Sequence, residues 1–367
     1  MTEKIKNIIT VSLISIIVFG FFAFCIIKPA DAYSETERRP LDQAPELSMN
    51  TILSGKFMSE FEDYTLDQFP FRDGFRTIKS AVAFYGFGQL ENNDLYIHDD
   101  YIAKVEYPYK KHSVDRAGNI FTSIYKRFMA DKNVNAYISV IPDKNFFLAD
   151  ESGRLSLDYE ALISDLIATT PDMEYIDITS LLDITDYYMT DTHWKQEKIY
   201  DVAKLLASNM GVTLDAEYEE KTVEGEFKGV YYGQLALPVK TDTLTYLTNP
   251  TLENCVVYDH QNSKNMEMYV IEKSTGRDPY EMFLGGSLSL VTIENPNAET
   301  DKELVIFRDS FGSAIAPFFP EAYSKVTVVD IRSIQSAILP RFVDFKNADV
   351  LFLYSTLVLN NSETIMQ

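Results

Sequence analysis

Three short segments near the C-terminus constrain the fold most, because each is apolar or β-branched throughout. They read LVIF at 304–307, VTVV at 326–329 and VLFL at 350–353. A strand with one face in water alternates apolar and polar side chains, whereas a parallel strand buried on both faces is continuously apolar. The segments between them have helical patterns, so this order predicts an α/β fold with a parallel sheet flanked by helices.

The preceding part of the chain fits the same alternation. Residues 213–300 differ, because they are irregular and strand-rich, and we interpret them as an insertion with its own small sheet. Turn and periodicity signals give the remaining boundaries. The predicted elements are a hairpin around Asp99 and Asp100, helices at 117–131, 155–169, 191–211, 310–323 and 334–345, a strand ending at Pro142, and strands at 303–308, 325–332 and 348–356.

The N-terminus predicts a transmembrane helix. Residues from Ile8 to Ile27 carry no charge, and these 20 residues suffice to cross a hydrocarbon core of about 30 Å. Lys4 and Lys6 precede the segment, which favours an N-terminus inside and a single-pass protein whose remainder is extracytoplasmic. Small residues around Ala30 leave cleavage as a signal peptide open.

This pattern divides the chain into an anchor at 1–28, a linker at 29–50 and a main domain at 51–367 that contains the insertion. Cys25 lies in the apolar segment and Cys255 is alone beyond it, so the exported part has no internal disulfide. That arrangement favours a bacterial, Gram-positive surface. Acidic residues number 55 against 33 basic ones, which argues against nucleic acid as a partner.

The segment VIFRDSFGSAIAPFF places Ser310 in a turn between a buried strand and a helix. A hydroxyl there stands at the carboxyl end of the sheet, where open α/β sheets bind ligands, and helix amides can stabilise an oxyanion. Ser310 is therefore a candidate nucleophile. The alternative is that Asp309 or Ser310 only caps the helix.

A serine nucleophile needs a base, and the chain has four histidines. Only His193, in YMTDTHWKQEKIY, has an acid two positions before it at the start of a predicted helix. In a turn, Asp191 can accept from Nδ1 and leave Nε2 facing the serine. The alternative is a helix cap beside a surface histidine. Trp194 is interpreted as a packing residue that holds the turn.

We expect neither a metal nor a cofactor, since no second histidine follows at i+4 and neither HExxH nor CxxC occurs.

The ordered motifs ERRPL, DQFPFRD, VIPDK, DTHW, YYGQLAL, MFLGG, FRDSFG, VVDIR and DVLFLY resemble the DHHW family of Gram-positive bacteria. The acid and base precede the serine, an order similar to that of the permuted SGNH-like domain of alginate O-acetyltransferases. The resemblance implies a permuted SGNH-hydrolase-like fold with an N-terminal transmembrane helix. It also implies Ser310 as nucleophile, His193 as base and Asp191 as the group that orients the base.

The sequence departs from the family pattern at three positions. Thr192 replaces the middle histidine of DHHW, Arg308 replaces a lysine, and Ser287 replaces the asparagine of FLGGN. The resemblance implies Gly286 and position 287 as oxyanion donors, and a serine there has a shorter reach and one donor. A plain turn before a strand is the alternative interpretation of this segment.

The resemblance implies an extracytoplasmic, membrane-anchored O-acyltransferase or esterase with a Ser-His-Asp triad, which O-acetylates a cell-envelope glycan. It further implies two partners, the envelope polysaccharide and a membrane-bound O-acyltransferase that supplies the acyl group. The alternative is a catalytically impaired glycan-binding protein of the cell envelope, favoured by Ser287 and by the 23 tyrosines available to stack on sugars.

Overall fold

The computed structural model describes residues 2–366, which form two compact units. Unit 1 extends to Asn93 and includes Tyr232–Pro238, whereas unit 2 comprises Asp94–Tyr231 and the chain from Val239 onward. These units divide the chain differently from the boundaries predicted at residues 28 and 50. The reason is that residues in the predicted linker pair with residues of the following helices, as described below.

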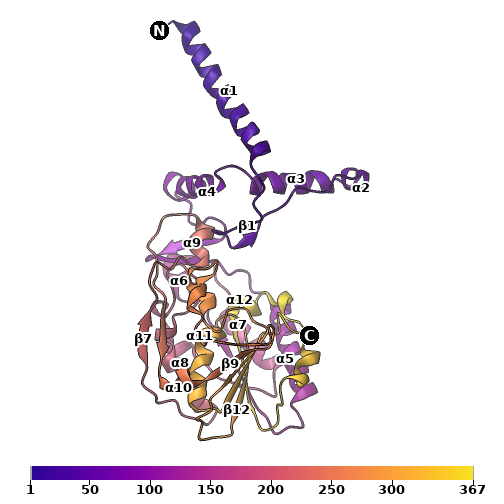
Figure 1. The fold of residues 1–367 in the computed structure, drawn as a ribbon, viewed down its shortest axis with the longest axis vertical. Coiled ribbons are helices and arrows are strands. Elements are labelled where there is room, and N and C mark those ends of the chain that lie inside the picture. Colours follow the sequence, from indigo (N-terminus) through magenta and orange to yellow (C-terminus); the bar gives the residue numbers. More distant parts are fainter. Residues whose placement is uncertain (1, 367) are drawn as a thin grey trace. The chain divides into compact units, whose positions relative to one another are not determined.

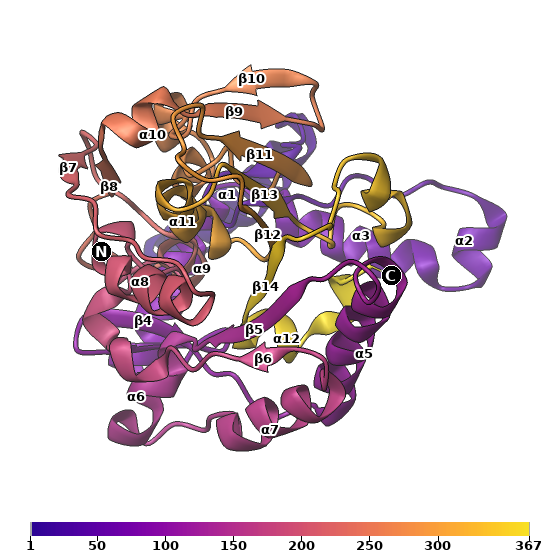
Figure 2. The same cartoon turned by 90° about the horizontal axis from the view of Figure 1, so that it is seen from below.

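Unit 2 is built on an eight-stranded sheet with the order β10-β9-β11-β13-β12-β14-β5-β6, visible as a fan in Figure 2. The strands from β13 to β6 are parallel, and β10, β9 and β11 are antiparallel. This is the predicted α/β class, with a mostly parallel mixed sheet. The bounds are β5 Asn135–Ile141, β6 Glu174–Tyr175, β9 Val256–Asp259, β10 Lys264–Met266, β11 Leu290–Glu294, β12 Glu303–Arg308, β13 Lys325–Val329 and β14 Asp349–Ser355.

Helices cover both faces of this sheet, so all of β14 and all of β12 except Glu303 are buried, as their apolar sequences predict. One apolar cluster packs α8 and α11 against the sheet, and the other packs α5 and α7 against the opposite face (Figures 1 and 2). The helices of unit 2 are α5 Lys111–Phe128, α6 Lys144–Ser152, α7 Tyr159–Thr169, α8 Tyr200–Asn209, α10 Pro250–Asn254, α11 Gly312–Ile315 and α12 Thr356–Leu359, and α9 Val230–Leu235 crosses the boundary between the units.

Three predicted helices are shorter than expected. The one predicted at 310–323 is α11 followed by a 3-10 segment at Ala316–Glu321, and the one predicted at 334–345 is a 3-10 segment at Ser336–Arg341. Pro320 and Pro340 lie in these segments, where proline lacks the amide that a regular helix requires. The helix predicted from residue 191 begins only with α8, after a turn and one 3-10 turn.

The insertion also differs from its prediction. Only β7 Glu219–Thr222 and β8 Thr245–Thr248 form a small sheet of their own. Strands β9, β10 and β11 instead extend the main sheet, because β11 pairs antiparallel with the apolar β13 along its whole length. The predicted hairpin is confirmed as β3 Leu95–His98 and β4 Tyr101–Lys104.

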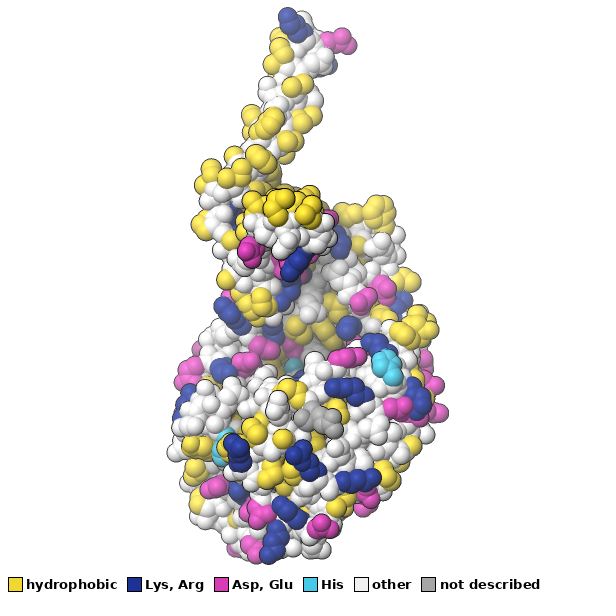
Figure 3. Space-filling model, turned by 90° about the vertical axis from the view of Figure 1, so that its right-hand side faces the viewer, with side chains coloured by type: hydrophobic (Ala, Val, Ile, Leu, Met, Phe, Trp, Pro, Cys, Tyr) yellow, Lys and Arg dark blue, Asp and Glu magenta, His cyan; other side chains and the backbone are white. Residues whose placement is uncertain are grey.

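Unit 1 consists of helices and one short strand pair. Helix α1, Glu3–Ile27, has no buried residue and is long and apolar enough to cross a membrane, a criterion that a signal sequence also meets. Apolar side chains cover it in Figure 3. The other elements are β1 Tyr33–Ser34, β2 Arg39–Pro40, α2 Met49–Leu53, α3 Lys56–Asp67 and α4 Arg72–Ala81, which continues as a π-helical turn at Val82–Gly86.

Candidate active site

The buried carboxylate of Asp309 holds the turn that carries Ser310. Its Oδ1 accepts the amide of Phe311 at 3.0 Å, and its Oδ2 accepts the amide and hydroxyl of Ser355 at 2.7 and 2.6 Å. Ser355 ends β14, so Asp309 joins the carboxyl ends of two neighbouring parallel strands. Ser310 is thereby placed, half-buried, at the edge of the sheet where ligands bind. The capping role that was predicted for either Asp309 or Ser310 therefore belongs to Asp309.

Asp191, His193 and Ser310 lie in one hydrogen-bonded line. Asp191 Oδ1 is 2.6 Å from His193 Nδ1 and also accepts the His193 amide at 3.1 Å. His193 Nε2 is 2.7 Å from the hydroxyl of Ser310, which is 117 positions away in the sequence. The carboxylate places the ring proton on Nδ1, so the Nε2 lone pair faces the serine hydroxyl.

Two further residues of the histidine segment hold it against the serine segment. The indole of Trp194, fully buried, donates to the carbonyl of Phe311 at 3.0 Å. The side chain of Gln196 donates to the carbonyl of Ala314 at 2.7 Å and accepts the amide of Leu247 at 2.8 Å. Trp194 thus packs and also donates a hydrogen bond. Sequence reasoning missed Gln196, whose only signal was a polar residue two positions after the tryptophan.

The Asp191 carboxylate is fixed from its other side as well. Its Oδ2 accepts the amide of Val230 at 2.8 Å, and a Cβ on the preceding Gly229 would lie 2.4 Å from the Cα of Asp191. The neighbouring Thr190 donates its hydroxyl to Asp242 at 2.6 Å and accepts the Gly229 amide at 3.0 Å. Only glycine at position 229 allows this close backbone approach.

Aromatic rings enclose the imidazole of His193. The ring of Tyr280 stacks on it with centroids 3.8 Å apart and planes 6° apart, and Phe311 lies at 4.8 Å. Burial raises the pKa of Tyr280 well above its usual value, so its hydroxyl stays protonated. That hydroxyl has no hydrogen-bond partner within residues 2–366. The Tyr280 ring therefore covers one face of the imidazole and fixes its plane.

Lys144 lies buried beneath the same turn. Its ammonium donates to the carbonyls of Tyr188 and Met189 at 3.0 and 3.1 Å and lies 5.0 Å from the ring centroid of Tyr231. Burial lowers the pKa of Lys144 to about 7. The Tyr231 hydroxyl donates to Thr192 at 3.2 Å, which gives the residue in place of the family histidine a structural contact. Lys144 belongs to the VIPDK motif, but no local pattern indicated that it would lie here.

The predicted oxyanion residues lie in a left-handed turn. The Gly286 amide donates to the carbonyl of Phe283 at 3.0 Å, and its carbonyl accepts from the fully buried Arg308 at 2.9 Å. Ser287 is exposed. Arg308 therefore attaches this turn to the end of β12, beside the serine. The role of Gly286 and Ser287 as oxyanion donors stays a prediction.

Amides close to Ser310 offer another source of oxyanion donors. Those of Phe311 and Gly312 already donate to Asp309, and that of Ser313 donates to the carbonyl of Ser310. The Ser310 amide has no acceptor in the part of the chain that the structure describes. This amide therefore has its donor capacity left for a ligand.

One cluster outside the triad could hold a cation by its ligand types. His98, Asp99 and Glu151 place one ligand atom each within 4.8 Å of one another. Both carboxylates are exposed, and exposed acidic groups of this kind commonly occur without a metal.

The chain is similar to one protein family and to several solved structures. Residues 175–329, which include Asp191, His193 and Ser310, match the model of the family described as DHHW protein. A crystal structure of a DHHW family protein from Eubacterium siraeum is 22% identical, covers 75% of this chain and 95% of its own, and has a TM-score of 0.61. Among curated protein sequences, none matches the chain.

Two more distant structures are also similar. Bacillus cereus PatB1 with a sulfonyl adduct is 17% identical, covers 74% of this chain and 96% of its own, and has a TM-score of 0.57. The O-acetyltransferase domain of Pseudomonas putida AlgJ is 10% identical, covers 72% and 92%, and has a TM-score of 0.42, too low to carry an argument. The likenesses to the Eubacterium siraeum protein and to PatB1 confirm the predicted α/β fold.

Proposed function

Because residues 175–329 match the family model described as DHHW protein, we propose that the chain is a serine-dependent O-acyltransferase or esterase. Ser310 is the nucleophile, His193 the general base and Asp191 the group that orients it. The observation that carries the proposal is the continuous pair of hydrogen bonds, 2.6 Å from acid to base and 2.7 Å from base to serine. Such a line is what activation of a weak hydroxyl nucleophile requires.

The reaction has two halves. The Ser310 oxygen attacks the acyl carbonyl while its proton moves to His193 Nε2, and the tetrahedral oxyanion collapses as Nε2 returns the proton to the departing group. This leaves an acyl-serine. An acceptor hydroxyl then gives its proton to Nε2 and attacks the acyl carbon, which releases Ser310 with its proton restored. A sugar hydroxyl makes the enzyme a transferase, and water makes it an esterase.

Acetyl transfer to a cell-envelope glycan is the substrate class that the family resemblance supports. Helix α1 serves as the single-pass membrane anchor, with the remainder of the chain outside the cytoplasm. Acyl-CoA is absent there, so a membrane-bound O-acyltransferase supplies the acyl group.

A glycan-binding protein with an impaired triad is the second candidate. It is favoured by the turn at the predicted oxyanion residues, where the Gly286 amide is engaged with Phe283 and Ser287 is exposed. Loss of an oxyanion donor lowers the rate by about 10²–10³. The two candidate functions differ in whether the chain turns over an acetyl ester.

Covalent labelling of the full chain in detergent tests the proposal. A sulfonyl fluoride sulfonylates an activated serine hydroxyl, and a sulfonyl adduct is present in the structure of the similar PatB1. We expect mass spectrometry to find the adduct on Ser310 and none in Ser310→Ala. Ser313→Ala is the matched control, because this neighbouring buried serine lacks a hydrogen-bond partner for its hydroxyl within residues 2–366 and should leave labelling intact.

Absence of labelling in the folded parent chain would exclude the activated serine. Glycan binding that survives Ser310→Ala, with no acetyl turnover by the parent chain, would favour the second candidate.

A further inference from the structure

Helix α4 and the turn after it carry an exposed apolar stripe. Its members recur every three or four residues, so those after the N-cap share one face of the helix, and Phe71 is the N-cap residue itself. They are large, and between 45% and 77% of each is exposed. A contiguous row of this size exceeds the scattered apolar residues of an ordinary surface. The stripe comprises Phe71, Phe75, Ile78, Val82 and Tyr85.

Ring contacts join this stripe to the last turns of α1. Phe21 stacks on Phe69 with centroids 5.7 Å apart and meets Phe75 edge-on at 6.0 Å. Phe24 contacts Phe71 at 5.8 Å. The apolar surface of α1 therefore continues, without a polar break at these rings, onto α4.

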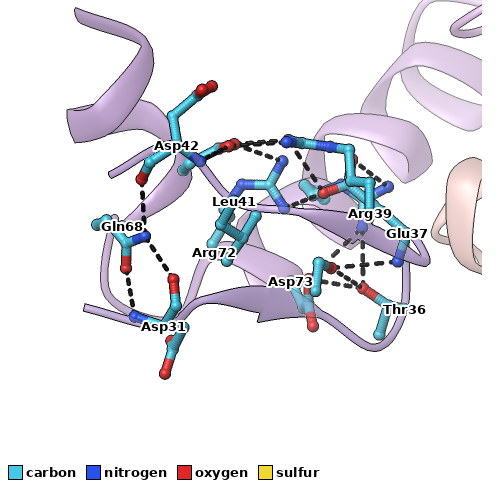
Figure 4. Close-up of polar contacts among 12 residues, drawn as sticks. Asp31, Thr36, Glu37, Arg39, Leu41, Asp42, Gln68, Arg72 and Asp73 are labelled. Carbon is cyan, nitrogen blue, oxygen red and sulfur yellow. Dashed lines mark hydrogen bonds and ion pairs between the residues drawn. The ribbon is translucent and has the colours of Figure 1, made fainter. Parts of the chain in front are cut away.

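A second face of α4 is basic and is held by an ion-pair network (Figure 4). Arg39 forms a bidentate pair with Asp67, with distances of 2.7 and 2.6 Å, and this pair lowers the pKa of Asp67 to about 2. Arg72 pairs with Glu37, and Arg76 donates to the carbonyl of Gly233 at 2.9 Å. These bonds connect the ERRPL and DQFPFRD motifs, which the catalytic site does not use.

The same network surrounds a strained residue. Phe71 has φ of 56° and ψ of 27°, a left-handed conformation that costs a bulky side chain about 1–2 kcal/mol. Asp67 and Arg72 lie on either side of it and are themselves close, with 3.4 Å between Oδ1 and Nη2. Because both flanks are held, the backbone keeps the conformation in which the ring contacts Phe24.

We propose that this stripe, together with Phe69, is a membrane-interface surface that lies at the boundary between lipid headgroups and acyl chains around α1. The proposal uses the anchor role of α1 from the proposed function and is independent of Ser310. Three observations select a lipid bilayer as the occupant: continuity with α1, aromatic rings at its end, and the amphipathic pattern of α4. Acidic residues outnumber basic ones between 29 and 93, so apolar insertion drives the contact.

Tryptophan reporters in the full chain test this surface. The chain is reconstituted alone into phosphatidylcholine vesicles, with and without lipids brominated near the headgroup. Phe75→Trp and Tyr85→Trp place the reporter on the stripe, and Thr77→Trp places it on another side of the same helix. The native Trp194 is fully buried in unit 2 and gives a constant background.

We expect brominated lipid to quench the Phe75→Trp and Tyr85→Trp signals about twofold more than the Thr77→Trp signal, as for a helix lying in the interface. Replacing part of the lipid by phosphatidylglycerol should not increase the quenching. Equal quenching at all three positions, or quenching only with anionic lipid, overturns the proposal. No quenching at any position also overturns it and points to a protein partner for the stripe. Circular dichroism confirms folding of each variant without reference to catalysis.

Discussion

The two units distribute polar and apolar side chains in opposite ways. Unit 2 buries β12 and β14 between helices and brings a few polar groups to one edge of its sheet. Unit 1 buries Asp67 and Gln68 and leaves the stripe of α4 exposed. The difference fits the two proposals, in which unit 2 acts on a substrate at one edge of its sheet and unit 1 lies against lipid.

In both units, hydrogen bonds to buried polar groups hold the residues that the two proposals use. In unit 2, Asp309 holds the turn that carries Ser310, and Trp194 holds the segment of His193 against it. In unit 1, Arg39 and Asp67 place apolar rings. If this comparison is right, each set of contacts can be removed with little effect on the other unit.

The largest expected effect is on catalysis by unit 2. Asp191→Asn removes the charge that stabilises the imidazolium and allows the wrong tautomer, so kcat for acetyl release should fall by about 10⁴. Rates from a chromogenic acetyl ester check this. Quenching at Phe75→Trp should not change in the same background. A fall of less than tenfold would contradict the role of Asp191.

A smaller effect is expected from glycines in the two units. The Cβ of Gly229→Ala would lie 2.4 Å from the backbone of Asp191, and such overpacking costs about 1–3 kcal/mol. Both thermal stability and labelling of Ser310 should fall. Gly74→Ala is the matched control, because its Cβ meets nothing within 4 Å on a helix of unit 1, and it should stabilise by up to about 1 kcal/mol. Equal effects of the two variants would contradict the close approach.

The burial of Lys144 predicts that the stability of unit 2 depends on pH. Burial lowers its pKa from 10.5 to about 7, so between these values the unfolded chain holds a proton that the folded chain lacks. The free energy of unfolding of unit 2 should therefore rise with pH across this window, by at most about 1.4 kcal/mol per pH unit. Below pH 7 the destabilisation caused by burying Lys144 has its full size. Lys144→Met should remove this slope in denaturant unfolding at pH 7.5 and 9.5. Parallel pH profiles of the two proteins would contradict it.

The smallest effect concerns unit 1. Asp67→Asn breaks the pair with Arg39, whose side chain is 39% exposed, so we expect a loss of about 1 kcal/mol. The wild-type pair lowers the pKa of Asp67 from 3.8 to about 2, so its contribution is complete above pH 3.8 and disappears as the pH falls toward 2. Faster proteolysis within residues 29–93, with unchanged labelling of Ser310, is the expected outcome. Lost labelling would mean that the units are not independent.

The sequence by itself determined the features that depend on local pattern. Continuous apolar runs identified β12, β13 and β14, and the length of the uncharged segment identified α1. The chemistry of serine, histidine and aspartate, with the order of their motifs, identified Ser310, His193 and Asp191 as candidates. These features can be predicted from the sequence because burial and helical periodicity leave a pattern in residues that are neighbours in the chain.

Only the tertiary structure decided which distant segments meet. It joined β11 to β13 and therefore placed part of the predicted insertion in the main sheet. It also brought Gln196 to Ala314, Gly229 to Asp191, and Arg39 to Asp67. A polar side chain carries no local sign of which remote carbonyl or carboxylate it will pair with. The partner is set by the path of the whole chain. Folds that bury a polar group without a partner lose free energy of folding, so the fold that pairs these groups is favoured.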